Sequence, residues 1–167
     1  MSRAFVKESD DDTVAGELPE RPLPPHANYV TPRGLELLQA RVRELTESHE
    51  QWNRTADDDS AARQKLRETE RDLRYFNSQL ERATLVDTHN QPREEVHFGA
   101  IVKIDDNEGK EQEFAIVGDD EADVAAGKIS WASPMARAML GARVGETVVW
   151  QRPAGEAELT VVDIRYV

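Results

Sequence analysis

Two runs of seam residues with heptad spacing constrain the fold of this chain more than any other feature. The first run recurs at alternating intervals of three and four residues: Leu35, Leu38, Val42, Leu45, His49 and Trp52. The second run follows an acidic interruption and keeps the same alternation: Ala62, Leu66, Thr69, Leu73, Phe76, Leu80 and Ala83. Such spacing places each run on one stripe of an α-helix. The sequence therefore predicts two long helices, each with one buried seam.

The two seams face one another if the chain folds back at a turn centred on Asp59. The facing pairs are then Leu38–Leu80, Val42–Phe76, Leu45–Leu73, His49–Thr69, Trp52–Leu66 and Ala56–Ala62. A polar pair in an apolar seam fixes register, so His49 is interpreted as a seam residue rather than a metal ligand. Thr31 and Pro32 are suited to begin the first helix. We predict an antiparallel coiled-coil hairpin over residues 29–90, with its tip near 57–61; pairing between two parallel chains is the alternative.

Residues 91–167 have the pattern of a small β unit. Short runs rich in β-branched residues, separated by turn residues, predict strands over 100–104, 113–117, 147–150 and 158–166. Ser133, Pro134 and Gly141 suit the cap, first turn and end of a short helix over 134–140. The predicted fold class is α+β, with the helical hairpin followed by an antiparallel sheet on which one helix packs.

Residues 1–28 are rich in proline and acidic residues. Such a segment has too little apolar surface to fold alone, so we predict a disordered tail. The alternative is that Phe5 and Val6 dock onto a partner or onto the second unit.

Composition excludes several classes of function. The net charge of −12 argues against duplex nucleic acid as the main partner, because phosphate binding requires clustered positive charge. No apolar run reaches the ~20 residues that span a bilayer, and no leader pattern is visible at the start, so a cytoplasmic location is expected. The chain has no cysteine, no glycine-rich phosphate loop and no clustered histidines. We therefore expect no catalytic activity of its own and no cofactor of its own.

Three consecutive carboxylates, Asp57, Asp58 and Asp59, fall at the predicted tip. Magnesium takes one or two carboxylates and keeps several waters, so such a tip suits an ion that another protein already holds in part. The structural alternative is that Asp57 or Asp58 caps the second helix, because aspartate is favoured at helix N-termini.

Several stretches resemble the GreA/GreB transcription elongation factor family. The most specific is Ser133-Pro134-Met135-Ala136-Arg137-Ala138-Met139-Leu140-Gly141, followed by Val144-Gly145-Glu146, by Pro153-Ala154-Gly155-Glu156 and by the chain's end, Val162 to Val167. Tyr29 to Leu35 resembles the family's first helix opening, and Leu66 to Asp87 resembles its second helix. The resemblance covers residues 29–167.

This resemblance implies a monomeric accessory factor of bacterial RNA polymerase. Its coiled coil would enter the polymerase secondary channel, and its FKBP-like C-terminal domain would grip the rim. The acidic tip, here Asp57, Asp58 and Asp59, would share the polymerase magnesium, so that the polymerase hydrolyses a backtracked transcript. Contact with the rim is expected at Ile129, Ser133, Pro134 and Met135; the alternative for Ser133 to Met135 is only a capped helix start.

Arginines recur along one side of the second helix, at Arg63, Arg67, Arg71 and Arg74. The resemblance implies that Arg63, Arg67 and Arg74 contact the nascent RNA 3′ end, whereas their acidic neighbours, such as Glu68 and Glu70, favour ordinary ion pairs instead.

The chain departs from the family pattern at the tip, where cleavage factors read roughly Asp-x-x-Glu-Asn-Ala and this chain reads Thr55 to Ala62 with a shorter arm. Two hypotheses follow: a factor that stimulates cleavage, or a non-cleaving secondary-channel regulator that inhibits or remodels transcription. A coiled-coil adaptor and a peptidyl-prolyl isomerase are the remaining alternatives.

Overall fold

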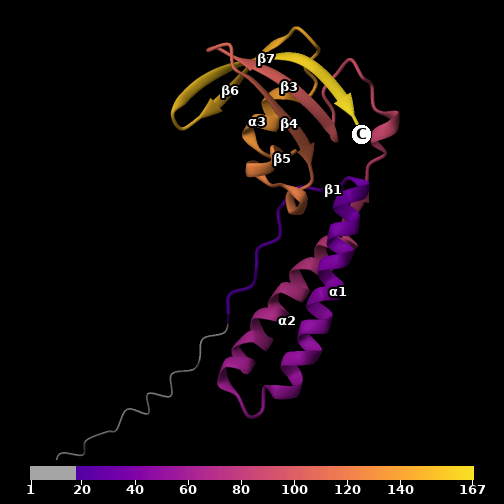
Figure 1. The fold of residues 1–167 in the computed structure, drawn as a ribbon, viewed down its shortest axis with the longest axis vertical. Helices are drawn as coiled ribbons and strands as arrows, with labels where there is room; N and C mark the ends of the chain where they lie inside the picture. Colours follow the sequence, from indigo (N-terminus) through magenta and orange to yellow (C-terminus); the bar gives the residue numbers. More distant parts are fainter. Residues whose placement is uncertain (1–17) are drawn as a thin grey trace, which may run out of the picture.

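A helical hairpin projects from a small β unit in the computed structural model, which describes residues 18–167 (Figure 1). The hairpin consists of α1 (Pro32–Thr55) and α2 (Ser60–Glu81). A four-residue turn joins the two helices at the end far from the β unit. The α+β class predicted from the sequence is confirmed at this level.

The side chains of both predicted seams lie on the inner faces of the hairpin. Every seam residue from Leu35 to Trp52 and from Ala62 to Ala83 is buried or half-buried, and Ala56 and Ala62 are buried at the tip. Two cross-helix contacts lie within one residue of the predicted register. The Arg41 guanidinium lies 5.7 Å from the centre of the Phe76 ring, and His49 Nε2 lies 3.3 Å from Glu70 Oε1.

Side-chain caps begin both helices. The Thr31 hydroxyl accepts a hydrogen bond from the Gly34 amide at 2.9 Å, with Pro32 in the first turn of α1. The Asp59 carboxylate accepts one from the Ala61 amide at 2.9 Å at the start of α2. The residue that caps α2 is thus Asp59, and the assignment of this role to Asp57 or Asp58 was wrong. The reason is register: α2 begins at Ser60, so only Asp59 occupies the cap position.

A short parallel strand pair closes the base of the hairpin. Strand β1 (Asn28–Val30) pairs with β2 (Ala83–Leu85), which joins the residues before α1 to those after α2. The buried Asn28 side chain donates a hydrogen bond to the Gln79 carbonyl oxygen at 2.7 Å. Strands of three residues are too short to give a periodic signal, so the sequence did not predict this pair.

The segment 18–27, predicted to belong to the disordered tail, instead lies along α2. Arg82 donates hydrogen bonds to the carbonyl oxygens of Pro24 and His26 at 3.0 and 2.6 Å. The Arg21 guanidinium stacks 4.0 Å from the centre of the Tyr75 ring. A segment without a core of its own is thus held by polar and cation–π contacts to α2. The rest of that prediction, and the alternative role of Phe5 and Val6, lies outside the described residues.

The β unit is built on a five-stranded sheet in the order β5-β4-β3-β7-β6. Its strands are β3 (Ala100–Asp106), β4 (Glu111–Val117), β5 (Lys128–Ser130), β6 (Thr147–Arg152) and β7 (Gly155–Tyr166). The four strands predicted from the sequence are present, each with wider bounds at one end or both. The prediction of a wholly antiparallel sheet was wrong, because the short strand β5 pairs with β4 in parallel. The intervening chain, which includes two 3₁₀ turns, η2 (Asp119–Glu121) and η3 (Val124–Ala126), provides the crossover that a parallel pair requires.

One helix covers one face of this sheet. Helix α3 (Pro134–Met139) buries Met135, Ala136 and Met139 against apolar side chains that alternate along the strands: Val102, Ile104, Ile116, Leu159 and Val161. A further 3₁₀ turn, η1 (Thr88–Asn90), lies in the connection from the hairpin. No helix within residues 18–167 is both long enough and apolar enough to cross a membrane.

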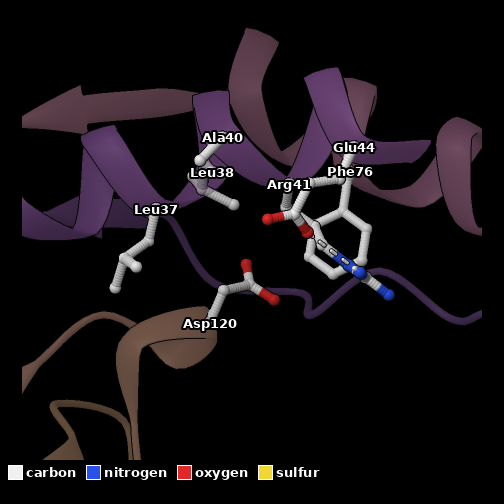
Figure 2. A pocket seen from close by; sticks show the side chains of 7 residues that line it. All are labelled: Leu37, Leu38, Ala40, Arg41, Glu44, Phe76 and Asp120. Atoms are coloured by element: carbon white, nitrogen blue, oxygen red, sulfur yellow. Dashed lines mark hydrogen bonds and ion pairs between the residues drawn. The ribbon is translucent and has the colours of Figure 1, made fainter. Parts of the chain in front are cut away.

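The acidic turn η2 joins the hairpin to the sheet. Asp120 accepts hydrogen bonds from the Tyr75 hydroxyl at 3.0 Å and from the Gln79 amide at 2.8 Å. Glu121 accepts one from the Thr31 hydroxyl at 2.5 Å, and Asp119 lies 2.5 Å from the His26 ring nitrogen. Figure 2 shows Asp120 facing α1 across a hollow of about 330 Å³ at the foot of the hairpin.

Backbone contact also holds this junction close. A side chain at Gly118 would bring its Cβ within 2.4 Å of the Tyr29 carbonyl oxygen. Only glycine therefore allows β1 and the end of β4 to approach this closely.

Replacing Asp120 with alanine should lower the free energy of unfolding by about 1–3 kcal/mol, because it leaves the buried Gln79 amide without its acceptor. Urea titration measures this change. The matched control is Asp123→Ala, at an exposed carboxylate on the same connection, which should change stability little.

The same variant has a spectroscopic signature. Burial, followed by the Asp120 carboxylate, raises the pKa of Tyr75 to about 12 from an ordinary 10.0. Because the pKa of Tyr75 is higher in the folded state than in the unfolded state, the contribution of the protonated phenol to the free energy of unfolding is complete below pH 10. This contribution is lost as the pH rises towards 12. Asp120→Ala should lower the pKa of Tyr75 and reduce this loss. An unchanged absorbance titration of the phenol would contradict the assigned contact.

Replacing Asp59 with alanine should destabilise the hairpin by about 0.5–2 kcal/mol, the usual cost of losing an N-cap. Asp59→Asn should be nearly neutral, because asparagine caps equally well. Thermal unfolding followed by circular dichroism measures both, with Asp58→Ala as the matched control. Equal losses for Asp58→Ala and Asp59→Ala would show that the cap does not act as described.

Candidate functional site: the hairpin tip and the groove beside α3

The hairpin tip presents two carboxylates to solvent. Asp57 and Asp58 are exposed in the turn between α1 and α2, and neither carboxylate hydrogen-bonds to another described residue. Asp59 is exposed as well, but its carboxylate is engaged as the cap of α2. The three aspartates predicted as one set therefore divide into two free carboxylates and one structural carboxylate.

The tip does not form a metal site by itself. Across residues 18–167, no group of three or more His, Asp or Glu side chains is arranged to hold a metal ion. Two carboxylates of one turn can supply at most part of the oxygen shell of a magnesium ion, which also retains waters. Chemically, the tip can complete a coordination shell that another molecule provides, and whether it does so stays a prediction.

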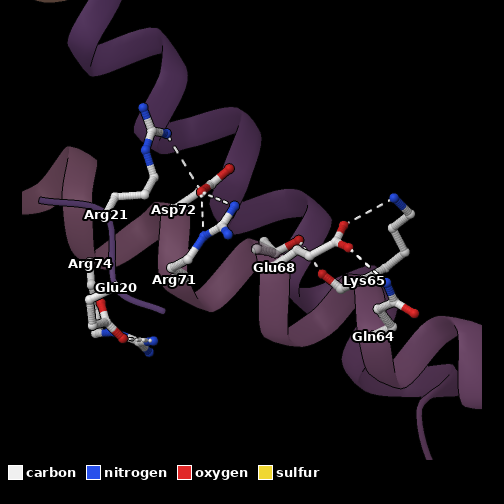
Figure 3. A network of polar contacts seen from close by, with 9 residues as sticks. Glu20, Arg21, Gln64, Lys65, Glu68, Arg71, Asp72 and Arg74 are labelled. Atoms are coloured by element: carbon white, nitrogen blue, oxygen red, sulfur yellow. Dashed lines mark hydrogen bonds and ion pairs between the residues drawn. The ribbon is translucent and has the colours of Figure 1, made fainter. Parts of the chain in front are cut away.

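The arginines of α2 differ in their engagement. Arg74 donates to both carboxylate oxygens of Glu20, the shortest contact being 2.6 Å. The side-chain hydrogen bond between them lowers the pKa of Glu20 and raises that of Arg74. Arg71 pairs with Asp72 at 3.1 Å, and Figure 3 shows both pairs along the helix.

Arg63 and Arg67, nearer the tip, are exposed and form no ion pair with another residue in the described part of the chain. The interpretation of the α2 arginines as ordinary ion-pair residues thus fits Arg71 and Arg74. The partner of Arg74 comes from the segment 18–27, which sequence periodicity did not place there. A role of Arg63, Arg67 and Arg74 in RNA contact stays a prediction.

An apolar groove lies beside the N-terminus of α3. Its volume is about 400 Å³, and Ser133 and Pro134 form part of its edge. Ser133 caps α3 by accepting a hydrogen bond from the Ala136 amide at 3.3 Å, while Pro134 is exposed in the first turn. These two of the four residues predicted to contact the rim therefore lie at the start of α3, Ser133 half-buried and Pro134 exposed.

Ile129 and Met135, the other two residues predicted to contact the rim, are largely buried. Only 6% of Ile129 and 8% of Met135 is exposed, because β5 and the first turn of α3 direct them into the core. They line the groove from below, so any contact that they make with a partner is through its floor, and their role in binding the polymerase stays a prediction.

Further groove residues come from other strands and were not predicted as site residues. Phe114 of β4 and Trp150 of β6 line the groove together with Pro153. Phe114 and Trp150 are half-buried positions of strands whose alternation was visible in the sequence. Only the sheet order, with β4 and β6 on opposite sides of β3 and β7, brings them towards α3.

Comparisons with known proteins agree with the family resemblance of the sequence motifs. Residues 91–166 match the family model described as transcription elongation factor, GreA/GreB, C-term. The chain is 33% identical over 154 residues to the transcription elongation factor GreB of Neisseria meningitidis serogroup B, covering 84% of this chain and 94% of that protein. It is 40% identical over 107 residues to the transcription elongation factor GreA of Nitratidesulfovibrio vulgaris, covering 64% of this chain and 66% of that protein.

Among solved structures, GreA factor homolog 1 of Thermus thermophilus aligns over 84% of this chain and 99% of its own, with 27% identity and a TM-score of 0.38. The sequence match to GreB extends over the hairpin and the β unit together, so it does not depend on the C-terminal motif alone. The chain therefore belongs to the GreA/GreB family of transcription elongation factors, which are accessory factors rather than enzymes.

Proposed function

We propose that this chain binds bacterial RNA polymerase, inserts its hairpin as a coiled coil into the secondary channel, and stimulates cleavage of backtracked transcripts. The observation that carries the proposal is the pair of free carboxylates, Asp57 and Asp58, at the end of a long narrow arm. Helix α1 has 24 residues, which corresponds to about 36 Å at 1.5 Å per residue. An arm of this length delivers its tip far from the unit that anchors it.

The tip acts on a magnesium ion that the polymerase holds in part. Asp57 and Asp58 supply hard oxygen ligands, and the ion retains water in its remaining positions. A carboxylate-bound magnesium lowers the pKa of such a water and orients it for attack on a phosphodiester. The polymerase site carries out the hydrolysis, and this chain contributes ligands to a shared ion without a cofactor of its own.

Asp59 has a supporting role in this proposal. Its bond to the Ala61 amide fixes the first turn of α2, and this turn sets the direction in which Asp57 and Asp58 point. Asp59 therefore positions the ligands rather than serving as one.

A second candidate function is a non-cleaving regulator of the same channel. It is favoured by the engagement of Asp59, which leaves two free carboxylates in a tip sequence that departs from the family pattern. In this role the arm would occupy the channel and inhibit or remodel transcription. The two candidates share the binding mode and differ only in what the tip does.

The groove beside α3 is the proposed contact with the channel rim. The β unit, which we infer to be an FKBP-like domain spanning residues 91–167, would rest on the rim through Pro134 and the adjoining apolar groove. Trp150 offers a large, half-buried ring beside Pro134, the kind of residue that commonly anchors protein interfaces. The factor would act as a monomer.

Asp57→Asn combined with Asp58→Asn should abolish stimulated cleavage in a stalled, backtracked elongation complex, because amides bind magnesium more weakly than carboxylates. Asp59→Asn should retain most of the stimulation, since asparagine keeps the cap. Gel analysis of a labelled transcript measures cleavage, and a competition assay measures polymerase affinity, which should stay unchanged in all variants.

Two outcomes would count against this proposal. Tight binding without cleavage by the natural chain would favour the non-cleaving regulator. Loss of polymerase affinity in the double variant would assign the tip a binding role instead of a catalytic one.

Pro134→Asp should weaken polymerase binding by about tenfold or more, because it places a charge at the edge of an apolar contact. The free energy of unfolding should change little, since Pro134 is exposed and aspartate is tolerated in a helix first turn. The matched control is Pro92→Asp, at an exposed proline in the connection before β3. Equal weakening by both variants, or loss of cooperative unfolding in Pro134→Asp, would contradict a specific rim contact.

A further inference from the structure

The segment 18–27 runs along the flank of α2 in an extended form. Arg82, at the end of α2, donates to the Pro24 carbonyl oxygen at 3.0 Å, and Arg74 donates to the Glu20 carboxylate at 2.6 Å. Between these two contacts the segment advances by four residues and the helix by eight. Four residues of polyproline II helix span about 12 Å, and eight residues of α-helix span about 12 Å as well. The contacts therefore match a segment that has the rise of a polyproline II helix.

The prolines of the segment favour the same conformation. Four of its ten residues are prolines: Pro19, Pro22, Pro24 and Pro25. Each proline ring fixes its own φ at about −65°, and each restricts the residue before it to extended backbone. A β-strand requires a φ of about −120° or below, so the prolines favour polyproline II helix with about three residues per turn.

Burial along the segment follows this period of three. One face is turned towards α2 and is half-buried: Leu18, Arg21 and Pro24. The next face is exposed and consists of proline alone: Pro19, Pro22 and Pro25. On the third face the Leu23 side chain is 42% exposed. These four exposed residues, Pro19, Pro22, Leu23 and Pro25, form a proline ridge on the outside of the arm.

The outward surface of the ridge is apolar and already ordered. The charged side chains beside it, Glu20 and Arg21, are engaged by Arg74, Asp72 and the Tyr75 ring of α2 (Figure 3). A free proline-rich peptide loses conformational freedom when a partner binds it, whereas a segment that α2 already holds loses less. Polyproline II segments are recognised by shallow grooves lined with aromatic side chains. The ridge therefore has the form of a pre-ordered ligand for such a groove.

The position of the ridge indicates which partner meets it. The segment extends from Arg82 at the base to a hollow lined by Leu18, Pro19 and Arg67, more than halfway along α2 towards the tip (Figure 1). Because the ridge lies on the flank of the arm, a channel that receives the arm to this depth must face it.

We propose that the proline ridge is a second contact with the polymerase, and that it fits a shallow groove lined by Trp, Tyr or Phe side chains in the wall of the channel. This inference rests on the proposed insertion of the arm and adds a recognition element outside its two helices. The ridge is separate from the groove beside α3 and from the carboxylates at the tip, so its contribution to affinity can be removed by itself.

A competition assay of polymerase affinity with the full-length chain tests the ridge. Pro19→Ala with Pro22→Ala, and separately Leu23→Asp, should each weaken binding by about fivefold or more, because each disrupts an apolar contact that the partner buries. The matched control is Pro92→Ala, at an exposed proline in the connection before β3, which should bind as tightly as the natural chain.

The Tyr75 phenol reports whether the segment stays on α2 in these variants. Burial and the Asp120 carboxylate raise the pKa of Tyr75, and the positive charge of Arg21 opposes them. Detachment of the segment would remove Arg21 and so raise this pKa further. An unchanged absorbance titration together with weaker polymerase binding therefore assigns the loss to the ridge itself.

Photo-cross-linking identifies the surface that the ridge meets. A p-benzoylphenylalanine in place of Leu23 should cross-link to a polymerase segment that contains Trp, Tyr or Phe. Two results would overturn the proposal: natural affinity in both ridge variants, or cross-links only to polymerase segments without an aromatic residue. In either case tight binding by the natural chain would leave the proposed function standing, whereas absence of binding by the natural chain would overturn both.

Discussion

The acidic turn η2 is the interaction on which the arrangement of this protein depends. Its three carboxylates receive hydrogen bonds or ion-pair contacts from the segment before β1, from the start of α1, from α2 and from β5. A narrow helical pair buries little apolar surface of its own, so its direction must be fixed at the base. Tyr75 and Gln79 serve this purpose because each places a polar group of α2 on one carboxylate, that of Asp120. Charge-assisted hydrogen bonds to this turn therefore help to fix the direction of the arm.

The sequence predicted those parts of the fold that repeat. The heptad runs identified both helices and the side chains between them, and alternation identified four of the five sheet strands. It failed where a structure depends on two short pieces meeting, as in β1 with β2 and β4 with β5, because three residues carry no period. It also failed for residues 18–27, since composition describes what a segment can bury alone and not what a neighbouring helix offers it.

In the candidate site, too, the features with a local sequence signal were predicted and those that depend on the assembled structure were not. The position of Asp57, Asp58 and Asp59 at the tip followed from the seam register, but the choice of Asp59 as the cap depends on the helix beginning at Ser60. Ser133 and Pro134 were named as contact residues because they belong to the motif that resembles the family, and the same residues mark a capped helix start. The burial of Ile129 and Met135 was not predicted, because it results from α3 packing across the sheet, a long-range contact without a local signature.

The closed base has a consequence for how such an arm can change its reach. Strands β1 and β2 join the two helices at the base, and the turn with its Asp59 cap joins them at the tip. The seam between these two ends consists of repeated heptad layers. Insertion or deletion of one heptad in each helix would move the tip by about 10 Å and preserve both the facing register and the two ends. The length of the arm can therefore change in steps of one heptad during evolution. Such a change leaves the residues of the tip and the contacts at the base unaltered.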